Sequence, residues 1–173
     1  RLHLWISHPT PPIFDGEEDR NGRRNYDEIA FWRLYLDGSE VLVDDAGVAG
    51  GYGAGEPFLV VGDLNADPAS PEARYEGRQA VGQLLAHPRL HDAGDLLVST
   101  GAADRERVGA ADPAQATAAF RPLMRLDHLI PGPGATPVDG GVFWPSEEAD
   151  PEGARLAEEA SDHRLVWLDL ELR

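Results

Sequence analysis

Asp63 and Asn65 stand two residues apart directly after a short apolar run, and their side chains could together hold a metal ion or a phosphate. The run Phe58–Val61 is bounded by Pro57 and Gly62, which predicts a buried strand that ends at the glycine. In extended backbone, side chains at positions i and i+2 point to the same side. A carboxylate and a carboxamide on one side offer the oxygen ligands that Mg²⁺ prefers. One alternative stays open, in which these side chains only cap the backbone of their own loop.

Three further groups of polar residues adjoin predicted strands. Taken singly, each has a structural explanation, because a lone histidine is more often a satisfied structural residue and an aspartate often caps a turn. Together with Asp63 and Asn65 they supply the imidazoles, carboxylates and amide that metal-assisted phosphoester hydrolysis requires. The groups are His8 at the end of Leu2–Ser7, Asp127 with His128 inside Leu123–Ile130, and Ser161, Asp162 and His163 before Leu165–Leu170.

The elements between these groups predict a mixed α and β class. Apolar spacing and a following Asp-Gly predict a helix over Asp27–Leu36, and a second helix is predicted over Gly77–Ala86. Asp92–Pro122 is rich in Ala, Asp and Pro, which indicates a long loop with at most short helical turns. Gly141–Trp144 is a further candidate strand, and Glu147–Ala160 is acidic and expected to be solvated.

Composition restricts the classes of partner. The 173 residues suit a single domain, the chain contains no cysteine, and no apolar stretch is long enough to span a membrane. The formal net charge is −16, and every basic residue among the 15 is arginine. Such a charge disfavours tight nonspecific binding to nucleic acid, which depends on neutralising phosphates with basic side chains. A small phosphoester fits better. No signal peptide is visible in this chain, and the choice between a cytoplasmic and a secreted protein stays open.

Three motifs follow one another along the chain: Gly62-Asp63-Leu64-Asn65, then Arg125-Leu126-Asp127-His128-Leu129-Ile130, then Ser161-Asp162-His163. In this order they resemble the motifs of the endonuclease/exonuclease/phosphatase superfamily, which includes pancreatic deoxyribonuclease, exonuclease III and bacterial sphingomyelinases. Any one of them is weak alone, and their order makes the resemblance specific. The segment from Ser7 to Ile29 is similar to a bacterial branch of that group.

This resemblance implies a role for each matching residue. Asp63 resembles the aspartate that orients or deprotonates the attacking water or handles the leaving-group proton. Asn65 and His8 resemble the amide and the imidazole that hydrogen-bond the phosphate. His163 resembles the catalytic histidine, with Asp127 as the carboxylate that fixes its tautomer. The metal ligands implied are Asp162, Asp63 and Asn65, for Mg²⁺ or alternatively Mn²⁺ or Ca²⁺.

The resemblance also implies a fold, an activity and an incomplete site. The expected class is α+β, and residues 1–173 would be the C-terminal portion of one four-layer α/β/β/α sandwich whose N-terminal half is missing. That half carries an asparagine and a glutamate, the latter the main metal ligand, so we expect this stretch alone to be inactive. The function implied is divalent-metal-dependent phosphoester hydrolysis. The alternatives are a nuclease and a non-catalytic binding module that kept the fold.

The basic pair Arg23 and Arg24, with Asn25, forms a last candidate group. A basic pair in an acidic chain, just before a predicted helix, could touch the substrate phosphate. The alternative is a surface loop that pairs with its own acidic residues, and it is at least equally well supported. Those acidic residues are Glu17, Glu18 and Asp19.

Overall fold

The structure is a computed structural model, and it describes residues 1–53, 55–70, 74–75, 77–103, 112–120 and 122–173. It has the predicted mixture of strands and helices. The elements in chain order are β1 (His3–Ile6), α1 (Arg20–Leu36), β2 (Phe58–Asp63), β3 (Arg74–Tyr75), β4 (Arg78–Gln79), α2 (Gly82–Leu85), α3 (Thr100–Ala103), the 3₁₀ helix η1 (Pro113–Gln115), β5 (Asp127–Pro131), β6 (Ala135–Phe143), α4 (Pro151–Ala160) and β7 (Leu165–Leu172).

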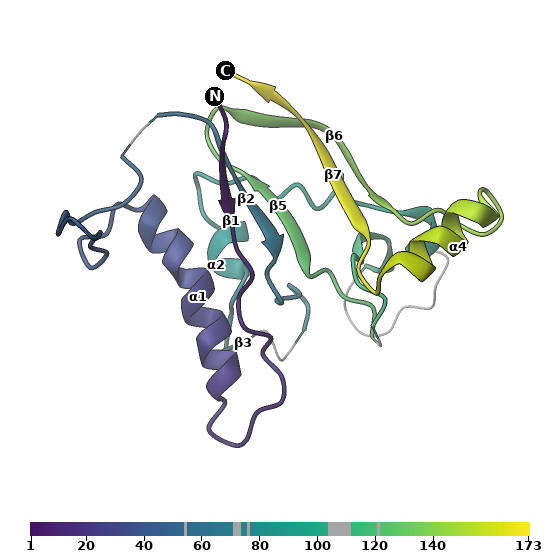
Figure 1. Cartoon of the computed structure of the whole chain (residues 1–173), viewed down its shortest axis with the longest axis horizontal. Coiled ribbons are helices and arrows are strands. Elements are labelled where there is room, and N and C mark those ends of the chain that lie inside the picture. Colours follow the sequence, from purple (N-terminus) through teal and green to yellow (C-terminus); the bar gives the residue numbers. More distant parts are fainter. Residues whose placement is uncertain (54, 71–73, 76, 104–111, 121) are drawn as a thin grey trace.

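Two sheets organise the chain around the candidate residues (Figure 1). The first has the order β1-β2-β5, with β1 parallel and β5 antiparallel to β2. In the second, β6 pairs antiparallel with β7 across a connection that contains α4, with a register shift between Pro137 and Asp139. We call this pair of strands the hairpin. In this register Asp63 at the end of β2 is paired with Asp127 at the beginning of β5. This edge of the first sheet is therefore where the polar residues gather.

One side of the first sheet is covered by α1 and a dense aromatic cluster. Trp5 lies between Phe58 and Trp32, stacked on the first with ring centroids 3.9 Å apart and on the second at 5.7 Å. Ile29 and Leu36 of α1 are buried in the same cluster. Burial of large aromatic and aliphatic side chains is the main favourable term in folding. This packing fixes α1 against the sheet and so places the loop that joins β1 to α1.

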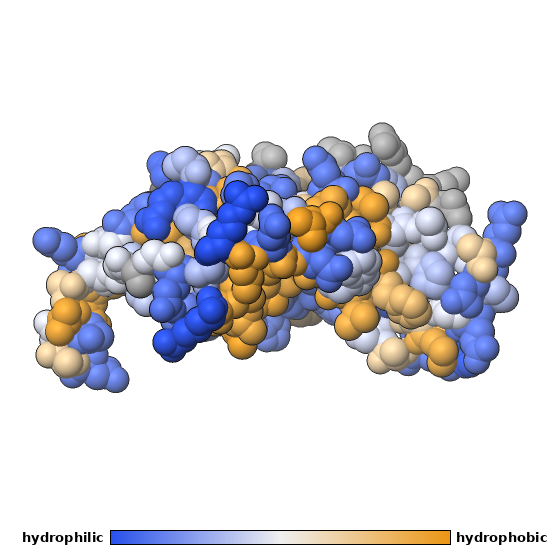
Figure 2. All heavy atoms as spheres, turned by 90° about the horizontal axis from the view of Figure 1, so that it is seen from above, coloured by the Kyte–Doolittle hydropathy of each residue, from blue (hydrophilic) through white to orange (hydrophobic). Residues whose placement is uncertain are grey.

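The opposite side of β1 is open. Leu4 is 55% exposed and Ile6 is 72% exposed, although each alternates with the buried Trp5. In the register Ile6 pairs with Val61, and side chains of paired residues share one side of a sheet. Asp63 lies two residues beyond Val61 and therefore faces the same open side. Viewed from the end where both termini lie, apolar side chains reach the surface in the middle of the molecule (Figure 2).

A second apolar cluster holds the hairpin. Leu97, Val142 and Trp144 are buried together, and Leu129 of β5 packs against them with Val166 and Leu168 of β7. This contact joins the first sheet to the hairpin and keeps the start of β7 near the start of β5.

The helices differ from the sequence prediction at their starts. The helix predicted from Asp27 begins at Arg20, because the Asp15 carboxylate accepts hydrogen bonds from the amides of Asn21 and Gly22 and so satisfies the first turn. The second predicted helix shrinks to α2. Among the described helices none is both long and apolar enough to cross a membrane.

Helix α4 was missed, although the sequence contains its start signal. Asp150 accepts a hydrogen bond from the Gly153 amide, and Pro151 follows as the first helical residue. The segment was expected to be solvated because it is acidic, but Gly153, Ala154 and Ala157 of this helix are buried.

The strand expectations were partly wrong. β5 begins at Asp127 instead of Leu123, so Asp127 lies at the start of the strand and not inside it. β6 is longer than the predicted Gly141–Trp144, because prolines and glycines broke its pattern while the hairpin with β7 kept it extended. The loop predicted over Asp92–Pro122 contains the short α3 and η1, and its residues 104–111 and 121 lie outside the described residues.

Candidate active site

The strongest contact of the candidate site joins His163 to Asp127. The Nδ1 atom of His163 lies 2.8 Å from Oδ2 of Asp127, so the predicted hydrogen bond between this ring and this carboxylate is confirmed. With Nδ1–H donating to the carboxylate, the free nitrogen of the neutral ring is Nε2, which faces Asp63. The pair thus presents a ring of fixed orientation to the edge of the first sheet.

Asp63 lies between two imidazoles. Its Oδ2 atom is 3.8 Å from Nε2 of His163 and 3.5 Å from Nε2 of His8. The His8 side chain is largely exposed, whereas that of Asp63 is mostly covered. Asp63, Asp127 and His163 also form a group whose potential ligand atoms lie within 4.8 Å of one another. Four strand ends therefore bring His8, Asp63, Asp127 and His163 into one cluster, which we call the edge cluster.

The other carboxylate oxygen of Asp63 stabilises the loop that follows β2. Its Oδ1 atom accepts a hydrogen bond of 2.8 Å from the backbone amide of Asn65. The alternative considered for this motif, an Asx cap of its own loop, is therefore present together with the edge cluster. One oxygen holds the loop, and the other faces the imidazoles.

Asn65 is placed by an unusual backbone and by a contact with the β1 end. Its φ is 49°, in the left-handed region that asparagine tolerates better than most residues. Its side-chain nitrogen donates to the Pro9 carbonyl oxygen at 3.0 Å, which directs Oδ1 away from that contact. Gly62 precedes the turn with a φ of 148°, and a Cβ there would lie 1.9 Å from the Ser7 carbonyl oxygen. Only glycine fits this close approach of β2 to the end of β1.

Asn25 is a positioning residue, and its place differs from the substrate contact expected for it. Its side chain is fully buried, and Nδ2 donates to the carbonyl oxygens of Thr10 and Leu64, each at 3.0 Å. Asn25 thus ties the loop after β1 to the loop after β2. It has no exposed surface to offer a ligand in this structure.

The neighbouring arginines have partners on their own helix or beside it. Arg24 pairs with Glu28 at 3.2 Å, one turn along α1, instead of with Glu17, Glu18 or Asp19. The Arg23 guanidinium carbon lies 5.4 Å from the centre of the Tyr75 ring. Glu28 in turn accepts hydrogen bonds from the Thr10 amide and hydroxyl. Burial raises the pKa of Glu28, but the bonds from Thr10 and the charge of Arg24 outweigh it and lower that pKa overall.

Asp162 stands beside the edge cluster without joining its contacts. Its exposed carboxylate accepts a hydrogen bond from the Ser161 hydroxyl at 3.4 Å, and its carbonyl oxygen accepts one from the Ala119 amide at 2.8 Å. Its carboxylate nevertheless acts electrostatically on the adjacent His163 ring. An exposed carboxylate at this position remains free to take a cation.

Thr117 and Phe120 complete the setting of His163, and sequence reasoning missed both. The Thr117 hydroxyl accepts hydrogen bonds from the amides of Leu126 and Asp127, and the Thr117 carbonyl oxygen accepts from the Arg164 amide. The Phe120 ring meets His163 edge to face, with centroids 5.6 Å apart. No local signal separated these two residues from the Ala- and Pro-rich segment around them.

The pKa values of Asp63 and His163 are both raised in the edge cluster. Burial, reinforced by the nearby Asp127 charge, raises the pKa of Asp63 against the lowering effect of the Asn65 amide and the two imidazoles. Burial lowers the pKa of His163, but the hydrogen bond and charge of Asp127 outweigh it, so that the pKa is raised overall. A carboxylate that is easier to protonate beside an imidazolium that is harder to deprotonate suits acid–base chemistry near neutral pH.

His128 points to the other side of the sheet, because it follows Asp127 directly in β5 and side chains alternate along a strand. Its ring is buried, and Nε2 lies 3.1 Å from the Ala66 carbonyl oxygen, to which it donates. Burial, helped by the Arg125 charge, lowers the pKa of His128 to about 3. This imidazole is therefore neutral and part of the core.

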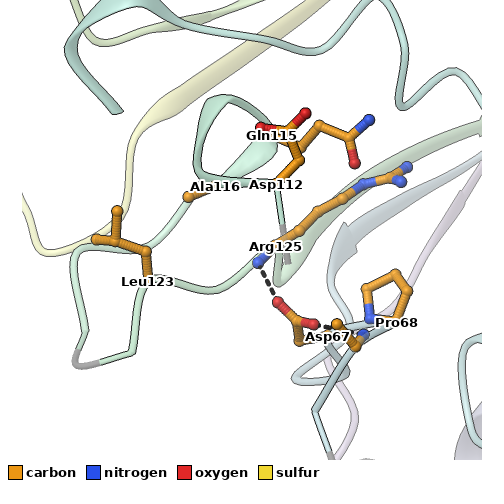
Figure 3. Close-up of a pocket in the computed structure, with 8 residues that line it drawn as sticks. Asp67, Pro68, Asp112, Gln115, Ala116, Leu123 and Arg125 are labelled. Carbon is orange, nitrogen blue, oxygen red and sulfur yellow. Dashed lines mark hydrogen bonds between the residues drawn. The ribbon is translucent and has the colours of Figure 1, made fainter. Parts of the chain in front are cut away.

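Asp67 is likewise structural, although it belongs to the same sequence motif as Asp63. It is buried and accepts a hydrogen bond from the Arg125 amide at 2.7 Å, so it ties the loop after β2 to the segment before β5 (Figure 3). It lines a small pocket of about 50 Å³ with Pro68, Asp112 and Arg125. Neither this pocket nor the larger one beside Trp144 contains a member of the edge cluster.

The donor set fits a divalent cation in part. The carboxylates of Asp63 and Asp162 and the amide oxygen of Asn65 are the hard ligands that Mg²⁺ prefers. Both oxygens of Asp63, however, already face the Asn65 amide or the imidazoles. The described residues therefore offer Asp162 and Asn65 as the less committed ligands, fewer than the near-octahedral shell of Mg²⁺ requires.

Comparison with known proteins agrees with the family suggested by the motifs. The family model of the Endonuclease/Exonuclease/phosphatase family matches residues 2–163. Comparison with curated proteins gave no match. Among solved structures, the endonuclease/exonuclease/phosphatase from Beutenbergia cavernae is similar, with a TM-score of 0.50 and 20% identity, over 98% of this chain and 34% of that one. The protein from Bacteroides vulgatus has a TM-score of 0.46 and 17% identity, over 88% of this chain and 46% of that one.

This chain thus spans less than half the length of either solved relative. The likeness to the first shows a shared fold, so the α+β arrangement is part of the deoxyribonuclease-like architecture. The family model covers most of the chain and includes the whole edge cluster. The chain belongs to the endonuclease/exonuclease/phosphatase family.

Proposed function

We propose that the edge cluster hydrolyses a phosphoester with the help of a divalent cation. The observation that carries this proposal is the chain of contacts from Asp127 through His163 to Asp63, at 2.8 and 3.8 Å, with His8 on the other side of Asp63. A non-catalytic binding module gains nothing from an aligned carboxylate, imidazole and second carboxylate. Family membership supports phosphoester chemistry, and the choice of substrate is our proposal.

In this proposal each residue has one task. Asp63 Oδ2 accepts the proton of the attacking water, since its raised pKa brings it closer to the pH of the reaction. The new bond from the water oxygen to phosphorus forms as the phosphorus–oxygen ester bond breaks, and the leaving oxygen departs with the bonding electron pair and takes up a proton from the solvent to become the alcohol. His163, protonated and held by Asp127, stabilises the negative charge that develops on the phosphoryl oxygens. His8 and Asn65 hydrogen-bond the remaining phosphoryl oxygens.

The cation would be held from this chain by Asp162 and Asn65. When bound, Mg²⁺ or a similar ion supplies charge neutralisation at the phosphate. Because the chain offers few fixed ligands, we expect the 173 residues alone to show no turnover and the full-length protein to be active. A net charge of −16 favours a small substrate over nucleic acid.

The test is a metal-titrated assay on the full-length protein with bis(4-nitrophenyl) phosphate. We expect turnover that disappears with EDTA and returns with Mg²⁺ or Mn²⁺. His163→Asn should reduce kcat by about 10²–10⁴-fold, the usual contribution of a positioned acid or base. Asp169→Asn, on an exposed position of β7, is the matched control and should leave kcat unchanged.

Two results would count against the proposal. A folded full-length protein with no turnover under any metal would support the binding module instead. Turnover of DNA with none of the small diester would keep the chemistry and replace the substrate by nucleic acid.

A further inference from the structure

One hydrogen bond does not by itself fix the orientation of the His163 ring. Its Nδ1 atom lies 2.8 Å from Asp127, whereas Nε2 lies 3.8 Å from Asp63, beyond hydrogen-bond distance. A ring held at one nitrogen can still tilt about that bond, and each tilt turns Nε2 away from the place where a phosphoryl group would lie. A second contact on the ring is needed if His163 is to keep one orientation.

Phe120 supplies a contact of this kind. The rings of Phe120 and His163 meet at an interplanar angle of 83° with their centroids 5.6 Å apart, which is the edge-to-face arrangement that aromatic pairs favour. Among the ring contacts of the described residues, Phe120 takes part in this one alone. The imidazole is thus held in two ways, by the hydrogen bond to Asp127 at one nitrogen and by packing against the phenyl ring.

Phe120 lies outside the apolar core. Its side chain is partly buried, but it belongs to neither of the two apolar clusters among the described residues. The preceding Ala119, in contrast, packs against the second cluster. A large apolar side chain outside a core gains less from burial than a core residue does. Its contact with His163 is therefore what distinguishes the position of Phe120.

The backbone before Phe120 is tied to the segment that carries His163. The Ala119 amide donates to the Asp162 carbonyl oxygen at 2.8 Å. One residue earlier, Ala118 forms an antiparallel bridge with His163 itself. The phenyl ring and the imidazole consequently stand on two backbone segments that are hydrogen-bonded to each other, so their relative position is supported from below.

We propose that Phe120 is a positioning residue that holds the His163 ring in the orientation required in the transition state. This role rests on the proposed phosphoester hydrolysis, in which His163 faces the phosphoryl group. Small misplacements of a group that acts in the transition state lower the rate strongly. Because Phe120 acts through the imidazole and not on the substrate, its loss should lower kcat and leave KM unchanged.

The experiment follows hydrolysis of bis(4-nitrophenyl) phosphate by the full-length protein in Mg²⁺. Phe120→Ala should reduce kcat by about three- to tenfold with KM unchanged, which corresponds to the loss of one aromatic contact. Phe120→Tyr keeps the ring and should retain the kcat of the wild type. Phe120→Leu keeps apolar volume without a flat ring, so it should also lower kcat even if Phe120→Ala does not fold. Phe143→Ala is the matched control, because it removes a phenyl ring that is 45% exposed on β6 and leaves the edge cluster intact.

A second measurement separates positioning of His163 from a general structural role. In the His163→Asn background the ring that Phe120 holds is absent, so adding Phe120→Ala should leave the residual kcat unchanged. The same fold-loss of kcat in both backgrounds would overturn the proposal, because Phe120 would then act independently of the imidazole.

The remaining outcomes distinguish this proposal from the one on which it rests. A raised KM with an unchanged kcat in Phe120→Ala would mean that the ring contacts the substrate, and it would overturn the positioning role alone. A wild-type kcat in both Phe120→Ala and Phe120→Leu would overturn it as well. Absence of turnover by the folded wild type under every metal would overturn the phosphoester hydrolysis and the role of Phe120 with it.

Discussion

Acid should destabilise this protein through one buried imidazole. His128 donates through Nε2 to the Ala66 carbonyl oxygen and is held neutral, with its pKa lowered to about 3 by burial and by Arg125. In the unfolded chain the same ring takes up a proton below its ordinary pKa of 6.5. Since the unfolded state then binds a proton that the folded state does not, stability is full above pH 6.5 and is lost as the pH falls toward 3.

The size of this loss follows from the shift. Each pH unit below the unfolded pKa costs about 1.4 kcal/mol for one proton. Between pH 6.5 and pH 5 the folded state should therefore lose about 2 kcal/mol through His128. That is a large share of the stability of an ordinary domain, which is about 5–15 kcal/mol.

His128→Gln tests this reasoning, because glutamine keeps a nitrogen donor at a similar reach and does not titrate. At pH 7.5 the variant should be less stable by about 1–2 kcal/mol, since the shape of the ring is lost. Its free energy of unfolding should then change less steeply with pH, so that the two proteins approach each other near pH 5. Urea unfolding followed by tryptophan fluorescence at several pH values gives the two curves. His91→Gln, on the surface, controls for removal of one imidazole from the unfolded chain.

Parallel curves for the wild type and His128→Gln would refute the argument. They would mean that His128 binds its proton equally well in the folded and unfolded states. A steeper curve for the variant would reverse the sign of the linkage and would contradict the buried, neutral state described above.

Three further changes test the edge cluster. Asp127→Asn removes the charge that raises the pKa of His163, so kcat should fall by about 10²–10⁴-fold. The alkaline limb of the plot of kcat/KM against pH should also move to lower pH, because His163 then loses its proton more easily. An unmoved limb would contradict the pairing of Asp127 with His163. Gly62→Ala places a Cβ against the Ser7 carbonyl oxygen and should cost about 2 kcal/mol or more of stability, measured by urea unfolding. Asn25→Ala should cost about 1–3 kcal/mol and lower kcat, because the two loops lose their shared donor; wild-type stability would show that the buried amide is dispensable.

The convergence of Asp63, Asp127 and His163 was predicted from the sequence together with the fold class, whereas several boundaries of the surrounding helices and strands were not. Asp63, Asp127 and His163 each adjoin a strand, and side-chain alternation separates Asp127 from His128. The alternation expected between Asp63 and Asn65 was wrong, because β2 ends at Asp63 and Asn65 is left-handed with a φ of 49°. The pairing of Asp63 with Asp127 depends on strand register, which no local pattern revealed.

The misses have physical causes. Asn25 was expected to contact the substrate because it follows Arg23 and Arg24. Successive side chains on a helix are rotated by about 100° around its axis, so Asn25 points inward while the arginines do not. There its side chain donates to two carbonyl oxygens. Thr117 could not be found, because a buried hydroxyl that accepts two amides has no sequence pattern until the chain is folded. Long-range hydrogen bonds, and not local propensity, decide such positions.

The two oxygens of Asp63 bear on how relatives of this chain should be compared. The loop cap needs only an acceptor at Oδ1, which asparagine also provides, whereas the imidazoles face a negative charge at Oδ2. A lineage that lost catalysis would thus keep aspartate or asparagine at position 63 for its fold, while the pairing of Asp127 with His163 would be free to drift. Retention of Asp63 alone is consequently poor evidence that a relative is active. Joint retention of Asp63, Asp127 and His163 is the informative signature, and asparagine at 63 with loss of the histidine would mark a descendant that has become a binding module.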